Sequence, residues 1–149
     1  SKMAEKKISQ LTAKGSNLET TDLFIISKSD GSGGYDTKYL TGAELTQVSL
    51  NNQTGTTYTL VLTDANKLVE VNNGSAINLT IPPNSGVAFP IGTQVVIAQQ
   101  GAGQITLVAG SGVTLRSRGG MLKLNAQYSV ATCIKRGTDE WYIAGDLTS

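Results

Sequence analysis

Hydrophobic and polar residues alternate with a period of two along several short segments between residues 57 and 143. Such alternation predicts β-strands that each turn one face toward a hydrophobic core. The positions expected to face that core are Tyr58, Leu60 and Leu62, then Ile77, Leu79 and Ile81, then Ile105 and Leu107, Val113 and Leu115, Leu122 and Leu124, then Tyr128, Val130, Thr132 and Ile134, and finally Trp141 and Ile143.

Turn-forming residues separate these segments. Glycine, asparagine and proline gather at residues 72–74, 82–86, 101–103, 110–112, 119–120 and 137–139. These residue types favour the backbone geometry of tight turns. About nine strands spaced this closely are typical of an antiparallel β-sandwich or a barrel-like domain. The pattern therefore predicts a mainly β protein with its larger domain over residues 54–149.

A smaller pattern precedes this domain. Residues 22–27 and 35–40 are strand-like, and the glycine-rich segment 29–34 between them predicts the turn of a β-hairpin. Upstream of the hairpin, three isolated apolar residues in polar surroundings predict an extended arm: Ile8, Leu11 and Leu18.

A capping box and a change in charge density mark the end of this first region. Thr41 and Glu44 have the spacing of a capping box, which predicts a short helix through Leu45 and Val48. Residues 1–50 carry 12 charged side chains, six of each sign, whereas the remaining two thirds of the chain carry 11. The polar segment 51–55 is expected to be a linker.

Composition narrows the possible functions. The chain has 149 residues with 12 Lys and Arg against 11 Asp and Glu, so its formal net charge of +1 provides no field that would attract nucleic acid or an anionic membrane. It contains no histidine, which excludes histidine-based catalysis and histidine metal sites. Unbroken apolar runs reach four residues, at 23–26 and 95–98, far short of a membrane span. The start of the chain lacks the apolar region of a secretory signal.

An unusual feature is the absence of charge from Val71 through Leu115, a stretch of 45 residues. A monomeric β protein normally places Lys and Glu on its outer strand faces, where they prevent pairing with other chains. We therefore expect much of this stretch to face other copies of the chain. The alternative is a surface rich in Thr, Asn and Gln that stays soluble without charge.

Candidate catalytic, cofactor and metal sites are not found in the sequence, and a non-enzymatic protein is expected. Asp139 and Glu140 are adjacent turn acids rather than a catalytic pair. The segment from Asp30 to Asp36 resembles the start of a calcium loop, but Thr41 stands where a bidentate Glu is needed. Cys133 lies in a strand-like segment and is expected to be a small packed side chain.

Two further groups of residues suggest ligand binding more weakly. Five basic residues without an intervening acid are expected on solvated outer faces, with a phosphate-bearing glycan as a less favoured ligand: Arg116, Arg118, Lys123, Lys135 and Arg136. Exposed Trp141, Tyr142 or Tyr58 could stack on sugars in a carbohydrate-binding module. Against this reading, Trp141 shares a strand face with Ile143 and is more simply a core residue.

Several segments resemble those of bacteriophage fibre and appendage proteins. In the first region these are residues 7–12 (KISQLT), 20–26 (TTDLFII) and 38–45 (KYLTGAEL). In the second region they are residues 58–65 (YTLVLTDA), 80–85 (TIPPNS), 89–93 (FPIGT), 100–106 (QGAGQIT) and 139–147 (DEWYIAGDL). Their order and spacing cover nearly the whole chain.

The resemblance implies a structural virion protein, usually a homotrimer, on tail fibres, head fibres or other surface appendages, with no catalytic residues. Residues 1–50 would anchor to other virion proteins, and residues 54–149 would project as a knob for adhesion to the host surface. Such domains often end a long shaft, and here a short arm and linker precede the domain. This favours a small capsid-attached fibre or decoration protein with a purely structural role as an alternative to a tail fibre. The remaining alternative is a carbohydrate-binding module.

Overall fold

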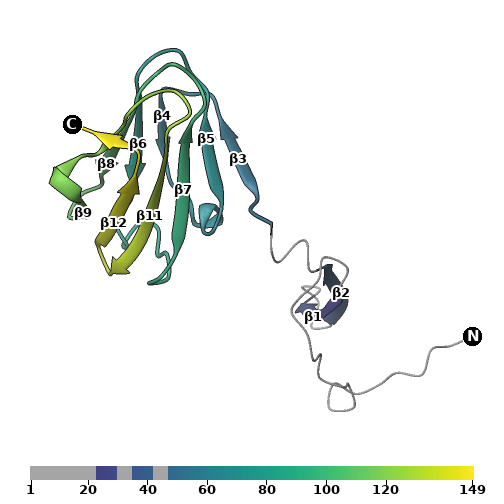
Figure 1. The fold of residues 1–149 in the computed structure, drawn as a ribbon. Helices are drawn as coiled ribbons and strands as arrows, with labels where there is room; N and C mark the ends of the chain where they lie inside the picture. The colour runs from purple at the N-terminus through teal and green to yellow at the C-terminus, as the bar shows by residue number, and fades with distance from the viewer. Residues whose placement is uncertain (1–22, 30–34, 42–46) are drawn as a thin grey trace, which may run out of the picture. The chain divides into compact units, whose positions relative to one another are not determined.

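A computed structural model of the protein describes residues 23–29, 35–41 and 47–149. The chain divides into two compact units, residues 1–47 and 48–149. In the first unit, strands β1 (Leu23–Ser29) and β2 (Tyr35–Thr41) pair antiparallel, with Leu23 opposite Thr41 and Ser29 opposite Tyr35 (Figure 1). These are the two segments for which the sequence predicts a hairpin.

Other predictions for the first unit fall outside the described residues. The extended arm, the hairpin turn and the calcium-like loop lie largely within residues 1–22 and 30–34, and the predicted helix lies largely within 42–46. Thr41, expected to begin that helix, ends β2, and Val48 belongs to no regular element.

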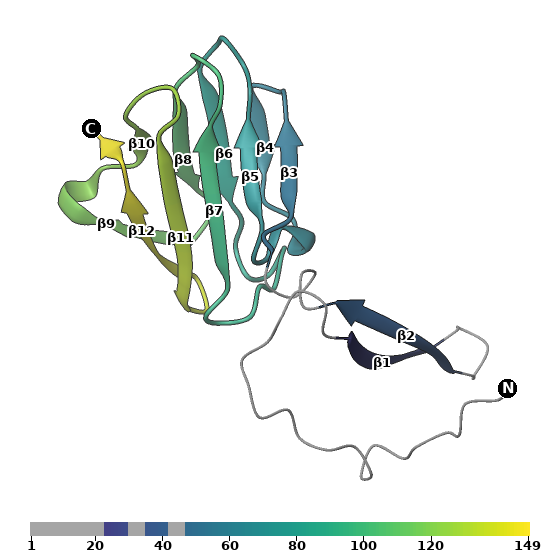
Figure 2. The ribbon, with the colours of Figure 1, turned by 45° about the vertical axis from the view of Figure 1, so that its right-hand side comes forward.

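The second unit consists of two β-sheets, which form two layers in Figures 1 and 2. The six-stranded sheet has the order β3-β5-β7-β11-β12-β9, and the five-stranded sheet has the order β13-β10-β8-β6-β4. The strands are β3 (Leu50–Gln53), β4 (Thr57–Thr59), β5 (Leu68–Val71), β6 (Ile77–Ile81), β7 (Gln94–Gln99), β8 (Ile105–Ala109), β9 (Thr114–Ser117), β10 (Lys123–Leu124), β11 (Val130–Gly137), β12 (Glu140–Gly145) and β13 (Leu147–Thr148). Short 3-10 turns lie at Leu62–Asp64 and Arg118–Gly120.

The path of the chain differs from the predicted antiparallel sandwich. From β3 to β10 successive strands alternate between the two sheets, so β3, β5 and β7 are parallel neighbours in one sheet and β4, β6 and β8 in the other. The hairpin β11–β12 lies between β7 and β9, with β11 antiparallel to β7 and β12 parallel to β9. Both sheets are therefore mixed, and the purely antiparallel prediction is wrong. The turn residues between β3 and β9 carry the chain across to the opposite sheet instead of folding it back on its neighbour.

The core lies between the two sheets and is built from the inward side chains of their strands. Its members include Val69, Val71, Ile77, Leu79, Ile81, Val95, Ile97, Ile105, Leu107, Leu124, Trp141 and Ile143. The Phe89 ring, from the connection between β6 and β7, meets the Trp141 ring edge to face at 5.5 Å between centroids. Such a contact adds to the stabilisation from buried area.

Three details of the predicted strands are corrected by the structure. The predicted linker at 51–55 is wrong in part, because Leu50–Gln53 forms β3 beside β5. Leu62 is 53% exposed because the chain leaves the strand direction in the turn at Leu62–Asp64. In β11 the core side is formed by Ala131, Cys133 and Lys135. Val130, Thr132 and Ile134, which were predicted to face the core, lie on the outer side of the strand. Among the described residues, no helix has the length and apolar character needed to cross a membrane.

Candidate recognition surface at one end of the sandwich

The residues that the sequence suggests for ligand binding lie in separate places in the structure. Trp141 is buried, as expected from its shared face with Ile143. The Tyr58 hydroxyl donates to the Asp64 carboxylate at 2.8 Å, beneath the β3–β4 edge. Tyr142 is 49% exposed and its ring lies 5.1 Å from the Arg136 guanidinium carbon. These three aromatic side chains do not form a common surface.

The five basic residues likewise form no continuous strip. The prediction that all lie on solvated outer faces is wrong for Lys135, which is 2% exposed. Its ammonium donates to Asn84 Oδ1 at 2.6 Å and to the Phe89 carbonyl oxygen at 2.7 Å. Lys135 therefore holds the long connection between β6 and β7 against β11. Arg118 lies elsewhere, in a surface pocket that is also lined by Leu147.

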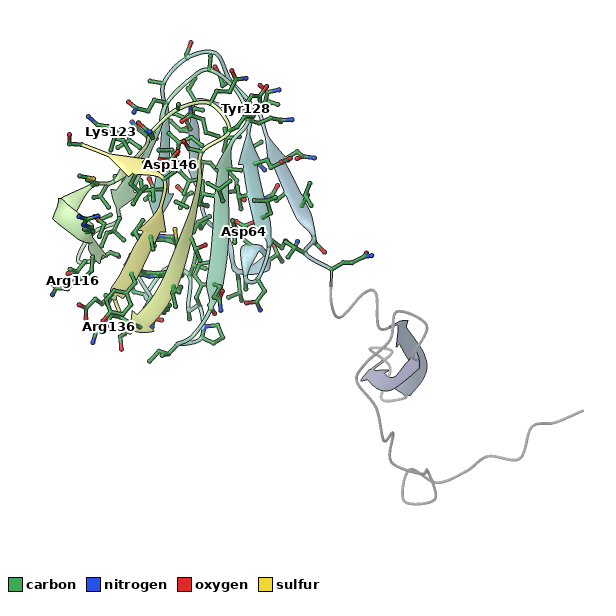
Figure 3. All side chains as sticks on the ribbon, in the orientation of Figure 1. Asp64, Arg116, Lys123, Tyr128, Arg136 and Asp146 are labelled. Atoms are coloured by element: carbon green, nitrogen blue, oxygen red, sulfur yellow. The ribbon has the colours of Figure 1, made fainter. Side chains whose placement is uncertain are left out.

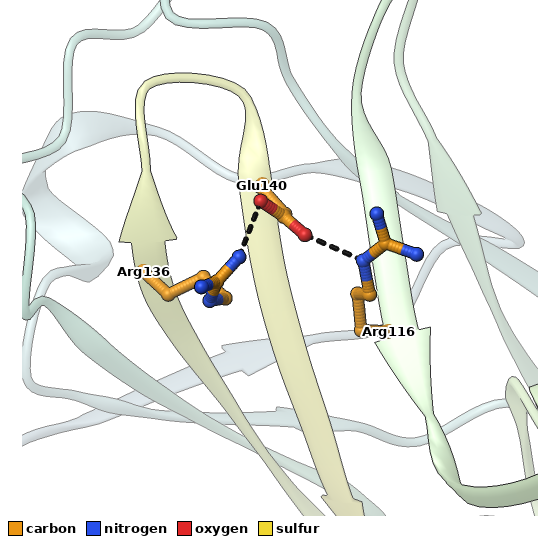
Figure 4. Close-up of polar contacts among 3 residues, drawn as sticks. All are labelled: Arg116, Arg136 and Glu140. Carbon is orange, nitrogen blue, oxygen red and sulfur yellow. Dashed lines mark hydrogen bonds and ion pairs between the residues drawn. The ribbon is translucent and has the colours of Figure 1, made fainter.

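Arg116 and Arg136 share one carboxylate (Figure 4). Arg116 Nε donates to Glu140 Oε1 at 2.5 Å, and Arg136 donates to Glu140 Oε2 at 2.6 Å. The hydrogen bond from Arg116 holds the pKa of Glu140 below its ordinary value, with a further contribution from Arg136. Glu140 is thus an ion-pair partner, and its neighbour Asp139 accepts the backbone N–H of Asn84 at 2.7 Å.

The described residues contain no group of three or more His, Cys, Asp or Glu side chains that could hold a metal ion. Cys133 is fully buried, which confirms its predicted packing role, and burial raises the pKa of its thiol to about 12. A buried thiol that stays protonated is a poor nucleophile.

A different surface emerges where four connections meet at one end of the sandwich. We call it the loop end, and it consists of residues 54–56, 72–76, 100–104 and 125–129. Hydrogen bonds join each connection to the next. Asn73 Nδ2 donates to the Thr54 carbonyl oxygen at 2.8 Å, the Gly103 N–H donates to the Asn73 carbonyl oxygen at 2.7 Å, and Gln127 Nε2 donates to the Gln100 carbonyl oxygen at 3.0 Å. The loop end is therefore one surface rather than four independent loops.

Close packing between two of these connections depends on glycine. A Cβ atom on Gly103 would overlap the carbonyl group of Ser75, and one on Gly101 would lie 2.5 Å from the Asn73 carbonyl oxygen. The 72–76 and 100–104 turns can stack at this spacing because both contact positions lack a side chain.

Tyr128 projects from the loop end. It is 75% exposed, and its φ of 70° lies in the left-handed region that non-glycine residues rarely adopt. Figure 3 shows Tyr128 at the upper end of the domain, with Arg116 and Arg136 at the lower end. An exposed aromatic side chain on a strained backbone is a feature that tends to occur at functional sites.

The strained conformation of Tyr128 is fixed by its neighbours. The Tyr128 N–H donates to the Gln99 carbonyl oxygen at 2.7 Å. The Ser129 hydroxyl accepts the N–H of Ala126 at 3.0 Å and donates to Asp146 Oδ2 at 2.6 Å. The backbone of the 125–129 loop is therefore held from its base by these hydrogen bonds.

The loop end has no charged residue within its four segments, which consist of Asn, Gln, Gly, Ser, Thr, Ala and Tyr. Rigid tyrosines combined with Ser, Gly and Asn are typical of recognition loops, because tyrosine supplies contact area at low entropic cost and the small polar residues supply hydrogen bonds. Such a surface suits a neutral, hydroxyl-rich ligand better than an anionic one.

This surface was not predicted from the sequence. The alternation at 128–134 predicts Tyr128 on the core side of a strand, whereas β11 begins at Val130 and Tyr128 lies in the preceding loop. The sequence does contain one signal for this surface, because its turn segments all lack charged residues and most are rich in Asn, Gln and Gly.

Comparison with known proteins gives no further assignment. No protein-family model matches the chain, and no curated protein matches it.

Proposed function

We propose that the protein is a non-enzymatic structural component of a bacteriophage virion, a short homotrimeric surface fibre or appendage. In this proposal residues near 1–50 anchor to other virion proteins and the β domain binds the host surface. The motifs at residues 7–12, 58–65 and 139–147, among those that resemble phage fibre proteins, support the virion assignment.

The observation that carries the adhesion role is the loop end with Tyr128. A 75% exposed ring on a backbone that is fixed by hydrogen bonds, in a loop cluster of uncharged amides and hydroxyls, matches the chemistry of a neutral surface glycan. A sugar has an apolar face that can lie on an aromatic ring and hydroxyls that pair with amide groups. The ligand class we propose is therefore a neutral oligosaccharide of the bacterial surface.

Cryo-electron microscopy of the phage that encodes the protein tests the virion assignment. Threefold density that fits the β domain, with the N-terminal region against the particle, is expected on the capsid, the tail or another appendage. Density at the tail tip or baseplate would favour adhesion, whereas density spread over the capsid would favour a head fibre or decoration protein. Particles that lack the protein altogether would overturn the proposal.

A further inference from the structure

The two sheets differ in the character of their outer faces. Strand positions that point away from the core are polar on the five-stranded sheet, apart from Val108: they are Thr57, Thr59, Asn78, Thr80, Thr106, Lys123 and Thr148. A sheet with one face in water normally has this polar outer face. The outer face of the six-stranded sheet does not follow the rule.

A row that is apolar except for Thr132 crosses the outer face of the six-stranded sheet, and we call it the apolar row. The strand register aligns Leu50 with Leu68, Leu68 with Val96, Val96 with Thr132, and Thr132 with Ala144. The row thus runs over five neighbouring strands from β3 to β12. More apolar side chains lie on either side of it: Ala98, Val130, Ile134 and Tyr142. Among these, Leu50 is 55%, Val130 44% and Tyr142 49% exposed.

The charged side chains on this face lie at opposite corners. Glu70 points outward from β5, toward the β3 edge, while Arg116, Arg136 and Glu140 lie near the β9 edge. Because two guanidinium groups share one carboxylate, the second corner has one positive charge in excess. In the strand register Glu70 lies two rows from Arg116, on the other side of the apolar row. A copy of the same face, turned over about an axis that lies in the plane of the face, oblique to the strands and perpendicular to the line from Glu70 to Arg116, would set each Glu70 against Arg116 of the other chain.

We propose that the outer face of the six-stranded sheet is a self-association surface, and that its occupant is the same face of a second copy of this chain. Burial of the apolar row favours association, and the attraction between Glu70 and the positively charged corner of the other chain fixes how the two faces align. Residues of this face lie before, within and after the uncharged stretch Val71–Leu115 in the sequence. The absence of charge from that stretch therefore does not by itself locate the surface.

Two matched valines test the proposal in the full-length chain. Val96 and Val108 are both half-buried, and they point outward from β7 in the six-stranded sheet and from β8 in the five-stranded sheet. Light scattering at micromolar concentration is expected to give a mass of two chains for the wild type and for Val108→Glu. Val96→Glu is expected to weaken association by at least about tenfold, because it places a charge in the contact. A monomeric wild type, or equal weakening by both substitutions, would overturn the proposal.

Disulfide cross-linking provides a second readout that does not depend on the stability of the Glu variants. Thr132 lies in the apolar row and Thr106 on the opposite outer face, and both are half-buried. Oxidation of Thr132→Cys is expected to yield a covalent pair of chains, and oxidation of Thr106→Cys is not. Cross-linking of Thr106→Cys alone would place the contact on the other sheet and refute the assignment.

Charge exchange tests the register of the two faces. Glu70→Arg is expected to weaken association, and the combination of Glu70→Arg with Arg116→Glu is expected to restore it. If adding Arg116→Glu does not restore association, the predicted pairing of Glu70 with Arg116 of the other chain is wrong. A mass of two chains would support the interface and replace the trimer of the proposed function by a dimer, whereas a mass of three chains would overturn the twofold interface. Association by a protein that is absent from virions would contradict only the virion role.

Discussion

The backbone N–H of Tyr128 donates a 2.7 Å hydrogen bond to the carbonyl oxygen of Gln99, which joins the 125–129 loop to the end of β7. The bond holds Tyr128 at a φ of 70°, although its side chain is 75% exposed and has little packing that would repay the strain. The strain therefore has no evident role in stability, and it is consistent with a role for Tyr128 in recognition.

Replacement of Tyr128 by glycine should leave the fold as stable as before or more stable. Glycine adopts a positive φ without the steric cost borne by other residues, so Tyr128→Gly is expected to change the free energy of unfolding by between zero and about +1 kcal/mol. Urea unfolding followed by Trp141 fluorescence measures this change. A loss of more than about 1 kcal/mol would show that the ring contributes to packing.

The two turns that stack at the loop end should be sensitive to a single methyl group. Gly103→Ala is expected to destabilise the domain by about 2 kcal/mol or more, because the new Cβ would overlap the Ser75 carbonyl group and force the turns apart. Gly74→Ala is the matched control, since nothing lies within 4 Å of its Cβ position. Equal midpoints for the two variants in thermal unfolding would contradict the packing described for the loop end.

A polar cluster closes the core beneath the β3–β4 edge. The Asp64 carboxylate is 1% exposed and accepts hydrogen bonds from Asn51 at 2.7 Å, from the Tyr58 hydroxyl at 2.8 Å and from the Val61 N–H at 2.9 Å. Asp64→Ala should cost about 3 kcal/mol, because three donors lose their acceptor, whereas Tyr58→Phe should cost about 1 kcal/mol. Denaturant titration of both variants and of the double variant measures the coupling between Asp64 and Tyr58. Additive effects would contradict the cluster.

Stability should fall in alkaline solution. Burial raises the pKa of the Cys133 thiol from 9.0 to about 12, and burial also raises the pKa of Tyr58, with a further contribution from Asp64. Well below pH 9 both groups are protonated in the folded and the unfolded chain, and at pH 9.0 the thiol of the unfolded chain is half ionised. Above pH 9 the unfolded chain loses protons that the folded chain retains, so stability decreases as the pH rises toward 12.

The share of Cys133 in this decrease can be isolated by substitution. The slope from Cys133 alone is at most about 1.4 kcal/mol per pH unit. Urea unfolding at a series of pH values between 8 and 11 should show a shallower decrease for Cys133→Val than for the wild type. Parallel curves for the two proteins would mean that the thiol ionises equally in both states.

The sequence predicted the strands whose apolar residues occupy one side only. Ile77, Leu79 and Ile81 alternate with polar residues and all three lie in the core, as expected. In β11 both sides carry apolar residues, so alternation cannot select the core side, and the smaller set Ala131 and Cys133 is buried.

Other features depend on contacts between distant parts of the chain. The polar strand β3 lacks a hydrophobic period because its inward residue Asn51 bonds with Asp64 instead of entering the core. Parallel pairing within the sheets could not be predicted, since a turn signal does not specify whether the next strand joins the same sheet or the opposite one. The position of Tyr128 depends on Gln99, almost thirty residues earlier in the sequence. Local patterns do not encode such relationships.

The most direct test of the adhesion role is binding of the labelled full-length protein to cells of the bacterial host, measured by flow cytometry. The wild type should bind, Tyr128→Gly should lose at least about tenfold in affinity, and Ile91→Ala should bind as the wild type does. Ile91 is the control because it is 67% exposed and lies in the connection between β6 and β7, at the opposite end of the strands from the loop end. Equal binding by all three proteins would contradict recognition through the loop end, and absence of binding by the wild type would contradict the adhesion role.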